Sequence, residues 1–407
     1  LVRSRGLGDV YKRQVELLVK ASEKHGYTYT MGEDGKLESV YDGSATYSND
    51  PTHSWGLWYV EKKSTSFTRS EGYGIKASDY TVTVWAYTEK DAEPAVAVDA
   101  TGISIYGYSQ PSSMVTLSPV CTEIVASMNA VSLIVGTDSY SNYPSSVVAG
   151  RDNGSFAVVG TYTDPSYESI MHRGPDMVIC DGSQYNQVQV AKTLRNSEVN
   201  SVVLYNAEDE KSIIDNIFIT GVAMNYGMRA LDVIESMTYA MNAIRSAVSG
   251  GAGTSVMVTL NTDASPTVAG SYTYVSDMLS SLNGNNVASE MNGWAHLTSE
   301  YVTKYNPSCI VILDSGTYSS DDYGRMLANL SPEWKNTDAY KNGNIYLLCE
   351  DIGELSQRAS PRSVQFFEIL ARILNPDSFP DGIVVPKTIG NDYVSYLTYT
   401  KDLGFGD

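Results

Sequence analysis

The stretch of residues 114–144 constrains the fold most, because it joins two short apolar runs through one helical pattern. The first run, residues 115–117, ends at a Ser-Pro pair, and a helical spacing of apolar residues begins directly after that pair. The second run, residues 133–135, is followed at once by the polar and aromatic loop 138–143. This order predicts a parallel βαβ unit, in which loops at the carboxyl ends of the strands bind ligands.

Apolar runs continue to alternate with helical patterns along most of the chain, which predicts an α/β fold with parallel sheets. In residues 114–226 the expected strands are 115–117, 133–135, 157–159, 177–180 and 202–205. In residues 251–376 they are 256–260, 310–313 and 345–348. Between these regions, apolar residues recur at helical spacing from Ala230 to Val248 and stop at a Gly-Gly pair. Residues 227–250 are therefore expected to form one long amphipathic helix.

The regions outside these two predicted lobes are less regular. Residues 1–14 look like a non-native leader and are excluded from the fold prediction. Residues 15–87 read as a small α+β domain, with a helix near 15–21 and strands at 56–60 and 80–87. Residues 88–113 read as a linker with room for one short strand, and no role is assigned to the tail 377–407.

Composition excludes some classes of protein. The 407 residues carry a net charge of −19, which argues against a nucleic-acid partner because phosphates require basic patches. The sequence contains no run of 18 apolar residues, so it predicts no membrane-spanning helix. Thirty Tyr against seven Phe favours surfaces that are half apolar and half hydrogen-bonded.

The sequence offers little for catalysis. The four cysteines stand singly without metal-ligand spacing, so we expect buried free thiols and no metal site. The four histidines are far apart, and nucleophile-elbow, zinc-protease, phosphate-loop and calcium-loop motifs are absent from the sequence. We therefore expect no enzymatic activity and no catalytic cofactor.

Four segments in register resemble the metal-chelate class of ABC-transporter solute-binding proteins, which capture cobalamin, haem or ferric siderophores. The segments are residues 114–144, 159–179, 292–312 and 357–365, and the likeness is strongest to the cobalamin-binding members. The resemblance implies a clamshell of two Rossmann-like lobes joined by one helix. It also implies capture of cobalamin or a related corrinoid as the transported ligand.

The resemblance also implies which residues meet the ligand. Aromatic platforms for a flat corrin ring are expected at Tyr140, Tyr162 and Trp294, with weaker support for Tyr185 and for Tyr272 or its neighbour Tyr274. Arg358 is expected to donate to ligand amides or a phosphate, although capping a helix or pairing with Glu354 is the alternative. Asp181 and Thr267 stand where the cobalamin binders carry Trp and Phe, which makes this pocket more polar and leaves the ligand open. His296 is either an axial ligand to iron or cobalt or an ordinary exposed histidine.

Partners and location follow from the same resemblance. Glu168 and Glu300 match two carboxylates, one on each lobe, that dock onto arginines of the membrane permease. The family implies a monomer outside the cytoplasm, tethered as a lipoprotein, although these residues contain no export signal. The rival functions are haem or ferric-siderophore capture, a corrinoid-processing enzyme, and a surface adhesion protein.

The small domain at residues 15–87 has a separate likeness. Its segments 55–60 and 78–87 resemble the carboxyl-terminal domain of the transcobalamins and intrinsic factor. A generic β-rich adhesion or spacer module is the alternative. If the likeness holds, two cobalamin-associated folds share one chain.

Overall fold

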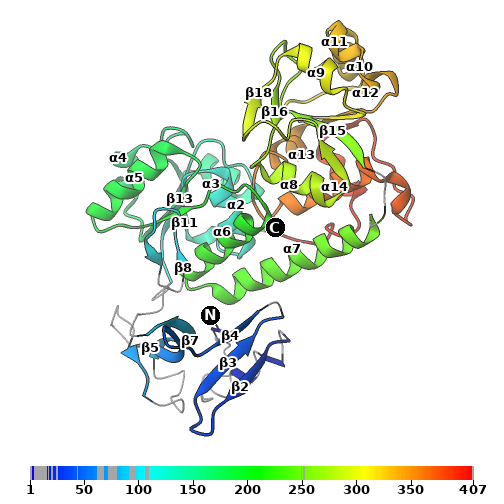
Figure 1. Ribbon diagram of the computed structural model, residues 1–407. Coiled ribbons are helices and arrows are strands. Elements are labelled where there is room, and N and C mark those ends of the chain that lie inside the picture. The colour runs from blue at the N-terminus through cyan, green and yellow to red at the C-terminus, as the bar shows by residue number, and fades with distance from the viewer. Residues whose placement is uncertain are drawn as a thin grey trace. The chain divides into compact units, whose positions relative to one another are not determined.

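The structure is a computed structural model that describes residues 2–3, 16, 18–19, 22–23, 26–43, 45–61, 68–71, 80–90, 97–105, 110–248, 250 and 253–405. The chain divides into two compact units. One unit comprises residues 1–111 and 221–228, and the other comprises residues 112–220 and 229–407. The second unit contains most of the long helix and two α/β lobes, here called the N-lobe (residues 112–220) and the C-lobe (residues 253–405) (Figure 1).

The first unit is built from small antiparallel sheets. The largest has the strand order β1-β7-β5-β6, and a second has the order β2-β3-β4. The bounds are β1 (Val2–Arg3), β2 (Thr28–Met31), β3 (Leu37–Tyr41), β4 (Thr46–Ser48), β5 (His53–Glu61), β6 (Thr68–Arg69) and β7 (Tyr80–Glu89). A two-stranded ribbon of β8 (Ala97–Val98) and β9 (Ser104–Ile105) lies within the expected linker.

Strand β7 differs from the half-buried strand that its alternating pattern predicts. Val84 and Trp85, which point to opposite faces, are both buried. Trp85 belongs to the core cluster of this unit together with Leu57. Both faces of the strand are therefore covered at this point. Residues 2–3 of the expected leader pair with β7, whereas most of the leader and part of the expected helix 15–21 lie outside the described residues.

The N-lobe contains a five-stranded, fully parallel sheet with the order β12-β11-β10-β13-β14. The strands are β10 (Met114–Thr116), β11 (Ile134–Thr137), β12 (Ala157–Val158), β13 (Met177–Asp181) and β14 (Asn200–Leu204). The helices are α2 (Pro119–Ser127), α3 (Ser145–Asp152), α4 (Tyr167–Arg173), α5 (Tyr185–Asn196) and α6 (Glu210–Ala223), with a 3₁₀ turn at Val131–Leu133. Each strand predicted for this lobe is present within two residues of its expected bounds.

The start of α2 shows how the sequence sets the boundary between strand and helix. Ser118 accepts a hydrogen bond from the backbone N–H of Cys121, and Pro119 occupies the first turn, where its missing N–H costs nothing. Central strand β10 has β11 on one side and β13 on the other. The chain connections change direction there, so a crevice forms at the carboxyl ends of these strands.

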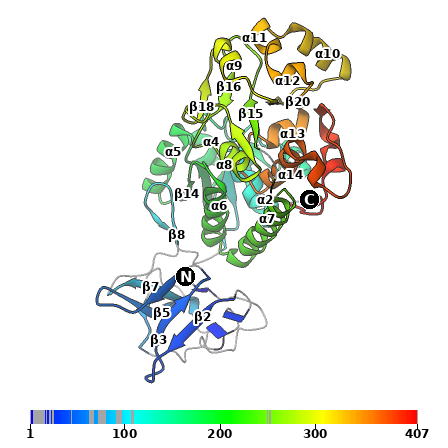
Figure 2. The ribbon, with the colours of Figure 1, turned by 45° about the vertical axis from the view of Figure 1, so that its right-hand side comes forward.

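Helix α7 (Gly227–Ala247) joins the lobes as one uninterrupted element of 21 residues, as predicted. In both views it extends from the N-lobe to the C-lobe (Figure 1, Figure 2). Its buried face repeats at helical spacing and consists of Ala230, Val233, Met237, Ala240, Met241 and Ile244.

The C-lobe contains a seven-stranded mixed sheet with the order β18-β16-β15-β19-β20-β21, and β17 also pairs with β15. The strands are β15 (Thr254–Thr259), β16 (Thr267–Ala269), β17 (Gly284–Asn286), β18 (Trp294–His296), β19 (Cys309–Leu313), β20 (Ile345–Leu348) and β21 (Thr388–Ile389). Only β15, β19 and β20 were expected. The additional strands β16 and β18 pair antiparallel with each other, and β16 also pairs antiparallel with β15. Both contain too few apolar residues to be recognised as strands in the sequence.

Helices of the C-lobe surround this sheet. They are α8 (Tyr274–Ser281), α9 (Ser299–Tyr305), α10 (Ser320–Asn329), α11 (Pro332–Lys335), α12 (Asp338–Lys341), α13 (Glu350–Leu355) and α14 (Ser363–Leu374), with 3₁₀ turns at Pro376–Ser378 and Asn391–Tyr396. All twelve residues of α14 are buried, so this helix is enclosed by its neighbours. Across the described residues, no helix is both long enough and apolar enough to cross a bilayer.

The segment after residue 376, to which the sequence assigned no role, is built into the C-lobe. Strand β21 adds to the sheet beside β20. The buried carboxylate of Glu368 accepts hydrogen bonds from the backbone N–H groups of Thr398 (2.7 Å), Tyr399 (3.1 Å) and Thr400 (2.9 Å). The same carboxylate pairs with buried Arg372 at 2.9 Å. The buried carboxylate of Glu368 therefore connects α14 to residues 398–400.

Replacing Glu368 by Gln should lower the free energy of unfolding by roughly 3 kcal/mol, because it removes a charged partner from buried Arg372. Urea denaturation followed by circular dichroism measures the change. The exposed Glu300→Gln variant is the matched control and should stay within about 0.5 kcal/mol of the wild type. Equal midpoints for both variants would contradict the structural role of Glu368.

Candidate functional site

A cavity of about 590 Å³ lies between the N-lobe and the C-lobe, and both lobes contribute to its wall. This volume is in the range of small-molecule sites. The N-lobe side includes Ser118, Tyr140, Tyr162, Asp181, Ser183, Gln184, Tyr205, Asn206 and Asn216. The C-lobe side includes Leu260, Tyr272, Thr273, Tyr274, Trp294, Ser315, Glu354, Gln357 and Arg358.

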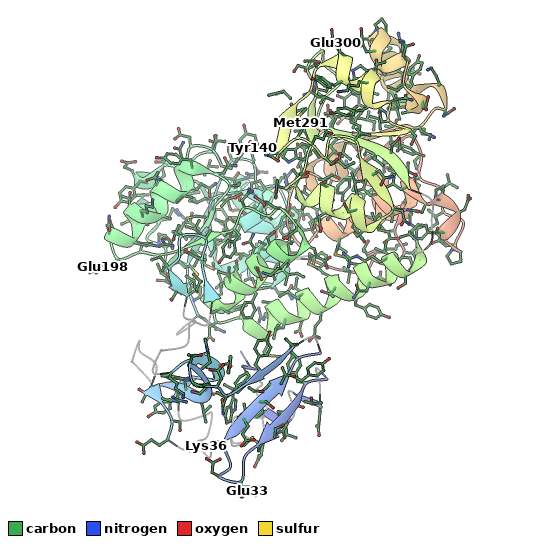
Figure 3. The ribbon with its side chains drawn as sticks, viewed as in Figure 1. Glu33, Lys36, Tyr140, Glu198, Met291 and Glu300 are labelled. Atoms are coloured by element: carbon green, nitrogen blue, oxygen red, sulfur yellow. The ribbon has the colours of Figure 1, made fainter. Side chains whose placement is uncertain are left out.

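Two tyrosines form the aromatic part of the N-lobe wall. Tyr140 follows β11 and Tyr162 follows β12, so both lie at carboxyl ends of parallel strands. Their ring centroids are 5.3 Å apart with an interplanar angle of 80°, an edge-to-face pair. Tyr140 remains 55% exposed, which leaves most of its ring free to meet a ligand. Figure 3 labels Tyr140 at the edge of the N-lobe.

Buried polar groups hold the Tyr140 loop in place. Asp138 accepts a hydrogen bond from the backbone N–H of Tyr140 at 2.7 Å and bonds both the N–H and the hydroxyl of Ser141. The Ser141 hydroxyl also bonds Thr122 of α2 at 2.8 Å. Burial raises the pKa of Asp138, and the hydrogen bonds from residues 140 and 141 oppose that shift. The loop is therefore attached to α2 through the hydrogen bond between Ser141 and Thr122.

The buried side chain of Gln187 holds three further segments in place. Its buried side-chain amide donates to the backbone carbonyls of Leu117 (2.9 Å) and Tyr162 (2.7 Å). Its carbonyl oxygen accepts from the backbone N–H of Asp181 at 2.7 Å. One α5 side chain thus fixes the positions of three cavity-lining segments relative to one another.

The C-lobe supplies facing aromatic groups. Trp294 stands at the start of β18, and Tyr272 lies in the loop before α8. Tyr272 has φ of +58°, a left-handed conformation that is rare for an aromatic residue. Tyr274 also lines the cavity, but its hydroxyl donates to the Ser356 carbonyl at 2.6 Å, and burial raises its pKa. Tyr272 is therefore the freer of these two tyrosines.

Arg358 lines the cavity and is already engaged on several sides. Its guanidinium donates to Glu123 Oε1 of the N-lobe at 2.7 Å, to Asn142 Oδ1 at 2.8 Å and to Glu354 Oε2 at 2.8 Å. The pairing with Glu354 that the sequence left as an alternative is therefore present. The same guanidinium also joins the two lobes across the bottom of the cavity.

Several sequence candidates do not lie in the cavity wall. Tyr185, the first residue of α5, is 75% exposed and is not among the residues that line the cavity. His296 and Thr267 pair with each other at 3.2 Å and also lie outside the lining. Glu168 and Glu300 are exposed in the first turns of α4 and α9, one on each lobe. Figure 3 labels Glu300 on the outer part of the C-lobe.

The structure adds lining residues that the sequence analysis missed. Tyr205 and Asn206 follow the end of β14, so the strand-end rule could have found them once that strand was assigned. Glu354 and Gln357 were close to Arg358 in sequence, yet no pattern distinguished them from solvated polar residues of a short helix.

Metal binding finds no support in the part of the chain that the structure describes, where no group of three His, Cys, Asp or Glu residues could hold an ion. The four cysteines are buried free thiols, as predicted. Burial raises the pKa of Cys309 to about 12 and that of Cys349 to about 11, which keeps both as thiols.

Comparison with known proteins adds family information. Residues 114–352 match the model of a family described as periplasmic binding protein. Over 292 residues the chain is 23% identical to an uncharacterized ABC transporter substrate-binding lipoprotein, YvrC, of Bacillus subtilis (strain 168). The match covers 71% of this chain and 88% of that protein.

Solved structures with the same fold include two with named ligands. The periplasmic heme-binding protein RhuT of Roseiflexus, in apo form, has a TM-score of 0.56 and 21% identity, and the match covers 67% of this chain and all of that one. The vitamin B12 binding protein BtuF of Vibrio cholerae has a TM-score of 0.54 and 17% identity, and the match covers 65% and 96%. These likenesses confirm the predicted two-lobed α/β fold. Because the family model spans more than half of the sequence, the chain belongs to the periplasmic binding protein family.

Proposed function

We propose that this protein captures cobalamin or a related corrinoid between its lobes outside the cytoplasm and delivers it to an ABC importer. The observation that supports this most is the aromatic lining from both lobes of one cavity. Tyr140 and Tyr162 come from the N-lobe, and Tyr272 and Trp294 come from the C-lobe. A corrin presents a flat, largely apolar ring, and burying it at about 25 cal/mol per Å² needs such rigid platforms on both sides.

The polar lining supports a corrinoid over haem. A corrinoid carries many neutral amide groups at its periphery, and Asn206, Gln184 and Gln357 offer matching amides. Haem carries two carboxylates, which need cations. Among the described lining residues, none is Lys or His, and Arg358 already bonds two carboxylates.

The importer and the location are part of the same proposal. The relative YvrC is by its name a substrate-binding lipoprotein of an ABC transporter. We infer the same role here, as a monomer tethered outside the cytoplasm without covalent chemistry of its own. The likeness of the first unit to a transcobalamin domain stays a hypothesis, with a spacer or adhesion module as its alternative.

Docking on the permease is assigned to Glu168 and Glu300. Both carboxylates are exposed, both open a helix, and each belongs to a different lobe. Two charge-assisted contacts so placed would engage the permease at both lobes together.

The first experiment measures ligand binding. Trp294→Ala and Tyr162→Ala should each weaken cyanocobalamin binding about tenfold or more, since one buried aromatic side chain contributes ~1.5–3 kcal/mol. Isothermal titration calorimetry gives the dissociation constants. Tyr185→Ala changes an exposed tyrosine outside the cavity and should leave them unchanged. Stoichiometric binding of haemin in place of cyanocobalamin, seen by visible absorption, would favour the haem rival.

The second experiment separates docking from ligand capture. The Glu168→Gln/Glu300→Gln double variant should bind corrinoid normally but transfer it at least fivefold more slowly to the organism's own importer in proteoliposomes, because both charged contacts are lost. Glu198→Gln, an exposed N-lobe residue labelled in Figure 3, is the control. Normal transfer by the double variant would refute the docking assignment.

A further inference from the structure

Two carboxylates line the cavity from opposite lobes. In each, one oxygen accepts no hydrogen bond from the residues that the structure describes. Asp181 lies at the carboxyl end of β13. Its Oδ1 accepts from the backbone N–H (2.9 Å) and the hydroxyl (2.7 Å) of Ser183. Its Oδ2 accepts no hydrogen bond from any residue that the structure describes. Gln187 holds the Asp181 backbone, so the carboxylate is fixed in position.

Glu354 is the corresponding group on the C-lobe. Its Oε2 accepts from Asn142 Nδ2 and from Arg358 at 2.8 Å. Within the described part of the chain, its Oε1 has no donor. The side chain is 26% exposed and lines the cavity. Its position is fixed by partners from both lobes, as that of Asp181 is fixed by Gln187.

The only cation in the described lining cannot offset these charges for an incoming anion. Arg358 is 11% exposed and divides its donors between Glu123 and Glu354. A carboxylate on a ligand would therefore meet Asp181 and Glu354 without a free positive partner. A neutral amide would instead donate its N–H groups to the open carboxylate oxygens in charge-assisted hydrogen bonds.

We propose that Asp181 and Glu354 select the ligand by its peripheral groups, accepting corrinoids whose side chains are carboxamides and rejecting those that carry free carboxylates. The inference rests on the proposed corrinoid function and narrows it to amidated corrinoids. Repulsion of the wrong ligand is a recognised route to specificity, and here it acts in the same two positions as the attraction.

The test compares two corrinoids that differ in these groups. Dicyanocobinamide carries carboxamides, dicyanocobyrinic acid carries carboxylates, and both have cyanide as axial ligand. Titration calorimetry of the full chain should give cobinamide an affinity at least tenfold higher. In Asp181→Asn/Glu354→Gln this preference should fall at least tenfold, because cobyrinic acid binds more tightly and cobinamide loses charged acceptors.

Asp164→Asn is the matched control, since it removes one exposed N-lobe carboxylate that is outside the cavity lining. It should leave the preference unchanged, and circular dichroism checks that all variants are folded. Equal wild-type affinities for the two corrinoids would overturn the selection while leaving corrinoid capture intact. A double variant that shifts the preference no more than Asp164→Asn would also overturn it. If neither corrinoid binds the wild type, the proposed function itself is refuted.

Discussion

The buried carboxylate of Glu123 is the interaction on which the arrangement of the two lobes depends. It projects from α2 of the N-lobe, is about 1% exposed, and receives Arg358 at 2.7 Å and the hydroxyl of Ser360 from the C-lobe. Arg362, also buried, lies 3.6 Å from it and stacks over Tyr143 of the N-lobe at 3.6 Å. A buried charge without partners would destabilise the fold by several kcal/mol. Because the partners of Glu123 come from the segment between α13 and α14, this segment must pack against the N-lobe for Glu123 to be buried.

The contact between Glu123 and Arg358 also reaches the cavity wall, through Arg358. Arg358, which pairs with Glu123, and Glu354, which accepts from Asn142, belong both to the contact between the lobes and to the cavity wall. Above them, the loops that carry Tyr140 and Tyr162 are fixed by Asp138 and Gln187. Because these hydrogen bonds already hold the lining side chains and loops in place, the site loses little conformational freedom when a rigid planar ligand enters.

Much of the fold could be predicted from sequence because local physics sets it. The strands β10, β13, β19 and β20 are short apolar runs buried in the sheets, and α7 shows its buried stripe at helical spacing. The weakly apolar β16, β18 and β21 were not predictable in this way, since they form only when a neighbouring strand supplies their hydrogen bonds. The Glu368 carboxylate likewise has meaning only once residues 398–400 fold back onto it.

For the site, the sequence by itself determined only that Tyr140, Tyr162 and Asp181 lie at or just after predicted strand ends, because strand ends are encoded locally. The family resemblance implied that Tyr140, Tyr162, Trp294 and Arg358 meet a ligand. Only the tertiary structure decided that these groups share one cavity, that Tyr185 lies outside it, and that Arg358 is committed to Glu123, 235 residues away in sequence. The physical reason is that a strand end or a helix depends on neighbouring residues, whereas the partners of a buried charge depend on how distant segments pack.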